Sequence, residues 1–179
     1  MVKAEGGGAL ASPGGTVLAD AVQCAQEFNA NIPVTGVDPQ TDKDKITKAS
    51  GALLTVLNAL AAACERAPDV GVLRDLSAAS ATLLQALLRL TLTAHAQKYV
   101  PKIPDVTAIF LRLLRSREPF VAYWTVMVLS AVLRCPLPDG KRNTKQEYEN
   151  KQLLLASAEI NSALVALLSD HKVAMLIKK

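Results

Sequence analysis

Aromatic residues and clustered metal ligands are both scarce in this sequence. Only 4% of the 179 residues are aromatic while 50% are hydrophobic, so the core must come mainly from Ala, Leu and Val, a composition that favours helices. The histidines, His95 and His171, and the cysteines, Cys24, Cys64 and Cys135, stand far apart. A zinc site usually shows a close pair of such residues. We therefore expect no metal and no other cofactor.

Secretory leaders, phosphate-binding loops and bilayer-length apolar runs are missing as well. The longest uncharged run, Ala49 to Cys64, has 16 residues, whereas a transmembrane helix needs roughly 20. The first residues are glycine-rich rather than basic and then apolar, so we expect no leader and reduced cysteines. These glycines also lack the Gly-Lys-Ser/Thr ending of a phosphate-binding loop. No transmembrane segment and no nucleotide site are predicted.

No residue pattern indicates catalysis. Glu147 and Glu149 lie two residues apart on an expected helix and so face different sides, which argues against a shared acid/base site. The members of a nucleophilic Cys–His pair need to be adjacent only in the folded chain, so the sequence neither predicts nor excludes such a pair. We expect that the protein is not an enzyme.

Charge is divided unevenly along the chain. The net charge is +4, but residues 1–97 carry −2 and residues 98–179 carry +6. A basic half of this kind can meet nucleic acid, anionic lipid or an acidic protein, and it can equally be a set of solvated helix faces. The densest cluster, Lys141, Arg142, Lys145 and Lys151, is interrupted by acidic residues and has one aromatic neighbour, Tyr148, for base stacking. Nucleic acid is therefore disfavoured.

Apolar residues recur at helical spacing, and no period-2 alternation is sustained, so the fold class is predicted to be all-α. Proline-containing connectors separate the expected helices. We place these at 18–28, 42–64, 69–76, 77–98, 106–114, 119–133, 144–156 and 158–169, with Ser77 and Asp105 as caps. In the helix expected at 42–64, the apolar stripe consists of Leu53, Leu57, Leu60 and Cys64.

Three of the expected helices carry specific predictions about packing. The clearest amphipathic stripe is Val106, Ile109, Phe110, Leu113 and Leu114. The uncharged run 120–133 is expected at the centre of the packing, buried on more than one side, because it is apolar nearly all round. In the last helix, the inner face is expected to hold Leu164, Leu167 and Leu168.

The organisation along the chain favours a helical repeat. Residues 1–16 hold five of the nine glycines and are predicted to form a flexible arm. Residues 17–179 are predicted to form a single all-helical domain, a fragment of a longer solenoid. The unit of helix, proline turn and apolar helix at 105–135 resembles armadillo and HEAT repeats. An irregular helical bundle is the alternative.

Two blocks, about 19–37 and 106–168, resemble one known family. The matching residues are Cys135-Pro136, Lys145-Gln146-Glu147, Asn150-Lys151, Leu153-Leu154 and Ser157, supported by Ala19-Asp20-Ala21-Val22, Phe28-Asn29-Ala30-Asn31-Ile32, Gly36-Val37 and Leu114-Arg115-Ser116. With these residues the sequence resembles the receptor-mediated endocytosis eight family, giant endosomal co-chaperones that carry a DnaJ domain.

The resemblance implies a segment of a long helical solenoid, cytoplasmic and peripheral on endosomes, that serves as a non-catalytic scaffold in endocytosis and endosomal sorting. Its implied partners are endosomal coat or sorting proteins. A heat-shock chaperone ATPase would be recruited only through a J domain, and the His-Pro-Asp tripeptide of that domain is absent here.

The candidate interaction surface is Lys141, Arg142, Lys145, Gln146, Asn150 and Lys151, a polar and basic stretch that capping and solvation would equally explain. The alternative function is a free-standing basic helical adaptor that binds nucleic acid or anionic membrane.

Overall fold

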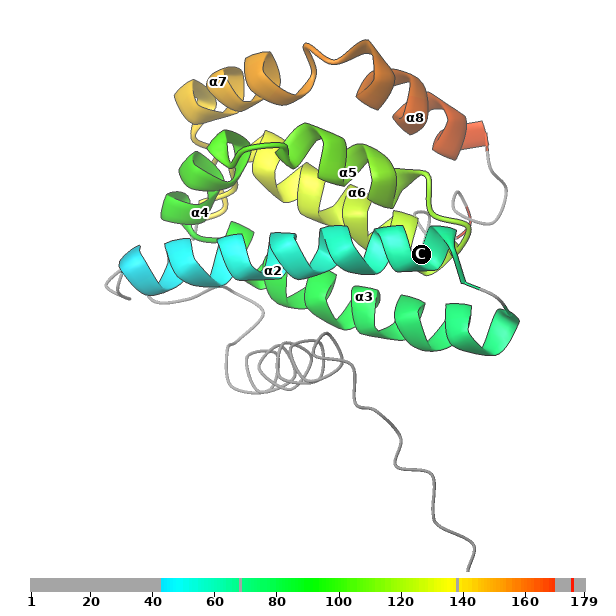
Figure 1. Ribbon diagram of the computed structural model, residues 1–179. Helices are drawn as coiled ribbons and strands as arrows, with labels where there is room; N and C mark the ends of the chain where they lie inside the picture. The colour runs from blue at the N-terminus through cyan, green and yellow to red at the C-terminus, as the bar shows by residue number, and fades with distance from the viewer. Residues whose placement is uncertain (1–42, 68, 138, 170–174, 176–179) are drawn as a thin grey trace, which may run out of the picture.

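The computed structural model describes residues 43–67, 69–137, 139–169 and 175. Within these residues the chain forms α-helices and one 3-10 helix, with a single isolated antiparallel bridge between Pro136 and Arg142 and no named strand. The all-α prediction is confirmed. The expected arm at 1–16 and the expected helix at 18–28 lie outside the described residues. In chain order (Figure 1) the elements are α2 (Lys43–Glu65), α3 (Val70–Thr91), α4 (Ala94–Tyr99), η1 (Val100–Lys102), α5 (Val106–Leu114), α6 (Pro119–Arg134), α7 (Thr144–Leu154) and α8 (Ala158–Ser169).

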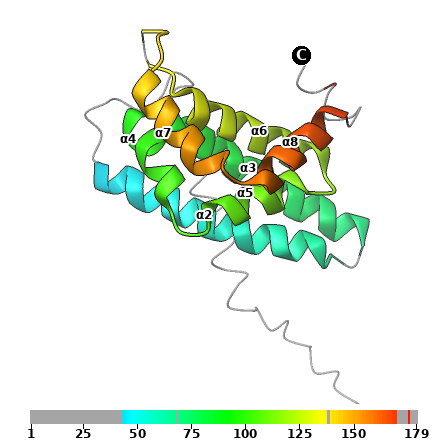
Figure 2. The same ribbon diagram turned by 90° about the horizontal axis from the view of Figure 1, so that it is seen from above.

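The helices are arranged in three tiers (Figure 1). The lowest tier is α2 with α3, the middle tier is α5 with α6, and the upper tier is α7 with α8. On one side α2 packs on α5 and α5 on α8, and on the other side α3 packs on α6 and α6 on α7. The short α4 lies against α2, α3, α6 and α7 at one end. From above (Figure 2), α7 and α8 cover the middle tier, and the chain bends by 99° between them.

The middle tier holds the core. In α5, all five residues of the predicted stripe are buried, and Phe110 and Leu113 are fully enclosed. Helix α6 contacts α3, α4, α5 and α7, which confirms its central position. Burial on more than one side is confirmed by the same contacts, although Phe120 is 59% exposed and Met127 is 36% exposed. Trp124 is partly buried against the core.

The lower tier differs from the sequence expectation at one cap. We expected a short helix through Leu76 and a new start at Ser77, but α3 is continuous and Ser77 is buried within it. The cap is Asp69, whose Oδ1 accepts a hydrogen bond of 2.8 Å from the backbone N–H of Val72. No proline follows Asp69 until Pro101, so nothing in the backbone stops the helix at Leu76.

The break after α3 comes earlier than expected. The chain turns by 101° between α3 and the α4–η1 segment, because the Thr93 hydroxyl accepts a hydrogen bond of 3.2 Å from the backbone N–H of Ala96 and starts α4. Pro101 lies inside η1 rather than in an extended connector. Asp105 precedes α5 as predicted, but it adopts a left-handed conformation at φ 59° and its side chain makes no capping bond.

In two helices the inner face differs from the prediction at one residue. In α2, Leu57, Leu60 and Cys64 are buried as predicted, while Leu54 is enclosed in place of Leu53, which is only partly buried. In α8, Leu164 and Leu167 pack against the core, but Leu168 is 68% exposed. The prediction for Leu168 was wrong: in the described residues the main packing of α8 is on α5 below it, which covers a narrower stripe.

Helix α2 is long enough and apolar enough, by length and composition, to cross a membrane. Among the described residues, two further segments qualify only as bent pairs, α3 with the α4–η1 segment and α7 with α8. In the folded chain, α2 uses its apolar stripe to pack on α3 and α5. The expectation of no transmembrane segment remains a prediction.

Candidate interaction surface

The turn between α6 and α7 sets the position of the predicted surface. Cys135 ends α6 with φ 44°, a left-handed conformation that reverses the chain direction. The turn closes when the N–H of Leu137 donates to the carbonyl of Lys141 at 2.8 Å and the N–H of Asn143 donates to the carbonyl of Cys135 at 3.0 Å. Gly140 adopts φ 80°, which a side chain would disfavour. This short reversal projects Lys141 and Arg142 outward.

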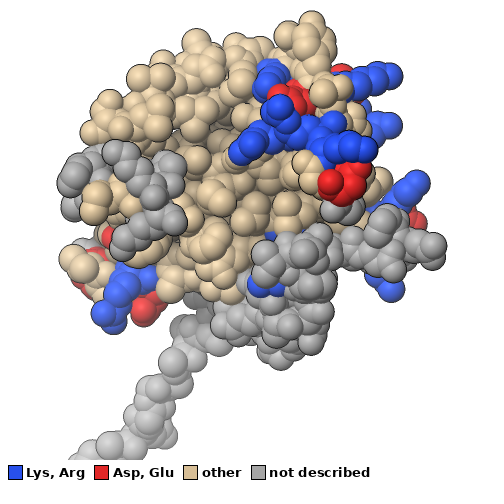
Figure 3. Space-filling model, turned by 180° about the vertical axis from the view of Figure 1, so that it is seen from behind, with Lys and Arg blue, Asp and Glu red and all other residues tan. Residues whose placement is uncertain are grey.

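Four of the six predicted residues form an exposed basic surface. Lys141, Arg142, Lys145 and Lys151 are all exposed. Figure 3 shows basic side chains gathered on this part of the molecule with acidic ones among them. Lys141 Nζ lies 3.4 Å from a carboxylate oxygen of Asp139, and Lys151 Nζ lies 2.6 Å from one of Glu147. The Lys141–Asp139 pair is exposed on both sides and contributes little to stability, so Lys141 remains able to exchange partners.

Glu147 is the anion at the centre of this surface. Its side chain is 13% exposed, and one carboxylate oxygen lies 3.7 Å from Arg142 Nη1. The hydrogen bond from Lys151 lowers the pKa of Glu147, and the charges of Lys151, Arg142 and Arg134 lower it further. Glu147 therefore stays ionised at neutral pH and offsets part of the local positive charge.

The other two predicted residues, Gln146 and Asn150, are not on the surface. Gln146 is 8% exposed and Asn150 is 0% exposed. Together with the fully buried Leu154 they occupy positions i, i+4 and i+8 of α7, which is the face that packs inward. The prediction that these two residues belong to the interaction surface was wrong. Because α7 has few apolar residues, two of the three positions on its inward face are occupied by amides.

These amides form a buried hydrogen-bond network that joins three helices. Asn150 Nδ2 donates to the backbone carbonyls of Gln97 in α4, at 2.9 Å, and of Val132 in α6, at 2.7 Å. Its Oδ1 accepts from Gln146 Nε2 at 2.8 Å. Gln97 Nε2 in turn donates to the carbonyl of Pro136 at 2.9 Å. One amide thus pairs carbonyls that the ends of α4 and α6 would otherwise leave unsatisfied.

The sequence contained a signal for this network. Gln146, Asn150 and Leu154 share one helical face at i, i+4 and i+8, and the leucine is the member of that face that favours burial. The partners, however, are backbone carbonyls 53 and 18 residues away along the chain, so only the tertiary fold identifies them.

Cys135 is part of the same buried cluster. Its Sγ–H donates to the carbonyl of Val132 at 3.1 Å, and Asn150 Nδ2 lies 3.3 Å from the sulfur. Burial raises the pKa of the Cys135 thiol to about 11, and the nearby charge of Glu147 adds to the effect. Burial also raises the pKa of Cys64.

We expect Cys135 to resist alkylation in the folded protein. The thiolate is the reactive form, and a pKa near 11 reduces its fraction at pH 8 by roughly two orders of magnitude relative to an ordinary cysteine. Iodoacetamide labelling at pH 8, with the labelled peptides quantified by mass spectrometry, should show slow modification that becomes fast in concentrated urea. Labelling of the folded protein at the rate of free cysteine would contradict this burial.

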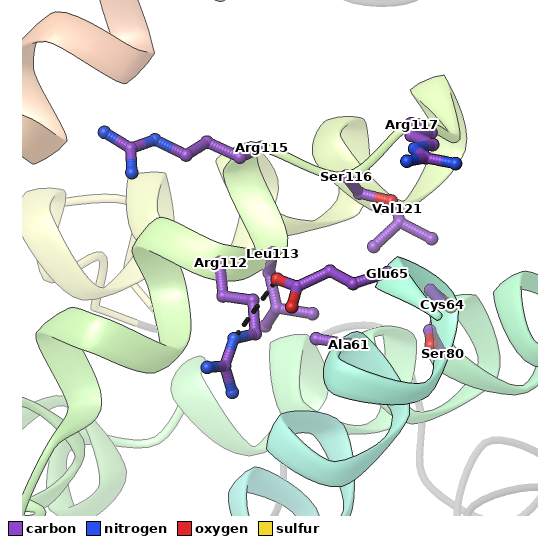
Figure 4. Close-up of a pocket in the computed structure, with 10 residues that line it drawn as sticks. All are labelled: Ala61, Cys64, Glu65, Ser80, Arg112, Leu113, Arg115, Ser116, Arg117 and Val121. Atoms are coloured by element: carbon purple, nitrogen blue, oxygen red, sulfur yellow. Dashed lines mark ion pairs between the residues drawn. The ribbon is translucent and has the colours of Figure 1, made fainter. Parts of the chain in front are cut away.

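A small hollow lies at the end of the middle tier opposite the α6–α7 turn (Figure 4). Its volume is about 70 Å³, enough for a few water molecules only. Arg112 Nε lies 3.3 Å from a carboxylate oxygen of Glu65, and Arg115 extends away from this pair. Cys64 borders the hollow, but no histidine does.

Within the described residues, the partners of the one histidine, His95, are a threonine and a tyrosine rather than a cysteine. His95 pairs with the hydroxyl of Thr47 at 2.9 Å and stacks on the ring of Tyr99. In the part of the chain that the structure describes, no three residues of the metal-ligating types are grouped. His171 and Cys24 lie outside that part.

Comparison of the sequence and structure with protein-family models, curated proteins and solved structures gives no match.

Proposed function

We propose that this chain is a non-catalytic, protein-binding segment built from armadillo-like helical repeats. The observation that carries the proposal is the order of stacking. The chain forms one unit of a short helix, α4, and two longer ones, α5 and α6. Two further helices, α7 and α8, follow this unit. The second of these packs on α5, while the first packs mainly on α6 and also on α4. Below them α2 packs on α5 and α3 packs on α6. The helices α2, α5 and α8 thus form one column, and α3 and α6 form another, as in a repeat array.

The pattern of contacts favours this arrangement over an irregular bundle. In a bundle all helices surround one core, whereas here no extensive contact joins α2 or α3 to α7 or α8 within the described residues. Each tier packs mainly on its neighbour. Such an array presents long exposed surfaces to partners and needs no reactive centre.

The proposed cellular setting is that of an endosomal trafficking co-chaperone, on the strength of the sequence resemblance alone. The residues that carry the resemblance have structural roles in this chain. Cys135 ends α6, Asn150 joins α7 to α4 and α6, and the Ser157 hydroxyl accepts a hydrogen bond from the N–H of Ile160 at the start of α8. They therefore support a shared fold more directly than a shared partner.

Affinity capture from cytosol tests the proposal. The full chain should recover endosomal coat or sorting proteins, and the variant Lys141→Glu, Arg142→Glu, Lys145→Glu should recover at least tenfold less, because it reverses the charge of the exposed basic surface. The matched control is Arg66→Glu, Arg74→Glu, Arg117→Glu, which reverses three exposed charges elsewhere and should capture normally.

Each other result has a defined meaning. Recovery of no endosomal sorting protein by the full chain would overturn the proposed setting. Equal recovery by the chain and by the first variant would overturn the role of the basic surface. Capture of nucleic acid, or of vesicles containing phosphatidylserine, in place of proteins would support the basic adaptor instead.

A further inference from the structure

An open groove lies beside the basic surface, between the C-terminal halves of α3 and α6. Its volume is about 440 Å³, within the range of sites that bind small ligands or a few side chains. The apolar lining comes from Leu88 of α3, from Leu92 directly after it, and from Met127 and Ala131 of α6. Met127 is 36% exposed although it lies midway along the central helix. The groove therefore offers an apolar floor that no described residue covers completely.

One end of the groove is cationic. Arg134, Lys141 and Arg142 line it, all three are exposed, and no carboxylate residue lines the groove. Lys141 and Arg142 have carboxylates nearby at 3.4 Å and 3.7 Å, while Arg134 makes no ion pair within the described residues. The carboxyl ends of α3 and α6 add partial negative charge, about half a unit each. The carboxylates of Asp139 and Glu147 offset part of the positive charge as well, while the exposed Lys145 and Lys151 nearby keep the surface around this edge basic.

The shape of the site distinguishes between two anionic partners. A membrane surface is best met by a flat or protruding basic face with apolar side chains that project outward. Here apolar side chains and cations line the same hollow, and basic side chains gather on this face of the molecule (Figure 3). A hollow of this kind fits an apolar side chain that enters it while neighbouring carboxylates reach the edge.

We propose that the groove between α3 and α6 binds an acidic protein segment, whose apolar side chain packs on Met127 and Leu92 and whose carboxylates pair with Arg134, Lys141 and Arg142. Charge complementarity and the adjoining apolar floor carry this assignment. It rests on the proposed protein-binding function and specifies the site and the chemistry of the partner. Complementary charge would mainly speed association, while the apolar contact would slow release.

The test uses a fluorescein-labelled dodecapeptide made of two Glu-Asp-Leu-Glu-Glu-Leu repeats, titrated with the full chain and followed by fluorescence anisotropy. We expect saturable binding that weakens with added salt. Met127→Glu, which places a charge on the floor, and Arg134→Glu/Arg142→Glu, which reverses the edge, should each weaken binding at least tenfold. The matched controls are Val165→Glu, at an exposed apolar residue of α8, and Arg66→Glu/Arg74→Glu. Both should bind normally.

Three results would overturn the proposal. The first is the absence of saturable peptide binding. The second is an unchanged affinity when every leucine of the peptide is replaced by serine, which would mean that charge alone attracts the peptide. The third is binding to vesicles with 20% phosphatidylserine but not to the peptide. The titration involves no cell extract. If it fails while the full chain still captures sorting proteins, the groove proposal is overturned and the proposed function is not. Circular dichroism should show the same helix content for every variant, since all the substituted residues are exposed.

Discussion

Replacement of Asn150 by aspartate is expected to destabilise the protein by about 3–5 kcal/mol at neutral pH, because it buries a charge that has the Gln146 amide as a donor but no opposite charge. The substitution keeps the shape of the side chain but removes both N–H groups that donate to the carbonyls of Gln97 and Val132. Two carbonyl oxygens and a sulfur would then face a carboxyl group. Typical domains have only about 5–15 kcal/mol of stability, so this loss is a large share.

The loss should depend on pH in a defined direction. Burial and the facing carbonyl oxygens raise the pKa of the new carboxyl group in the folded state above its value in the unfolded chain. The destabilisation should therefore be smallest below about pH 4, where the group is protonated in both states, and should grow as the pH rises. Urea unfolding at pH 7 and at pH 4, each referred to the unsubstituted chain, measures both effects.

The matched control for this prediction is Asn161→Asp. Asn161 is exposed, and its Nδ2 donates to the carbonyl of Leu155 at 2.9 Å. Loss of one exposed hydrogen bond should cost about 1 kcal/mol or less, with little pH dependence. If Asn150→Asp behaves like this control, the buried amide network does not hold α4, α6 and α7 together.

Truncation of Phe110 to alanine is expected to cost about 3–5 kcal/mol through loss of buried area and formation of a cavity. Phe110 is fully buried in α5, which packs on α2 below it, on α6 beside it and on α8 above it. The cavity would therefore open where the three tiers meet. Isothermal urea denaturation, followed by circular dichroism, measures the change in the free energy of unfolding.

Phe120 provides the matched control, because the same ring is 59% exposed at the start of α6. Phe120→Ala should change the free energy of unfolding by less than about 1 kcal/mol. A loss below 1 kcal/mol for Phe110→Ala, or equal losses for the two variants, would show that the middle tier is not the core.

The sequence predictions succeeded where the interactions that decide the structure join residues close together in the chain. In α5 the repeating apolar spacing alone predicts the buried face, because one stripe faces one core. The proline at the start of α6 marks its boundary through a purely local effect on the backbone. Ser77 was assigned wrongly as a cap because serine serves equally in a helix interior, and the stronger capping signal of Asp69 lay eight residues earlier.

The candidate surface was only partly predictable. The exposed cations Lys141, Arg142, Lys145 and Lys151 follow from their charge, since isolated charges are rarely buried. For Gln146 and Asn150 the sequence is ambiguous, because an amide is equally suited to water and to buried carbonyls. Their burial depends on the ends of α4 and α6, which lie far away in the chain.

By itself, the sequence determined the helical class, most helix boundaries, the inward stripe of α5 and the basic character of the second half. These depend on local backbone preferences and on spacing along one helix. Only the tertiary structure decided the order of the tiers, the buried role of Asn150 and the groove beside Met127. Each of these requires residues from different helices to come together, and the free energy that selects such a juxtaposition arises from contacts between segments, which no single segment encodes.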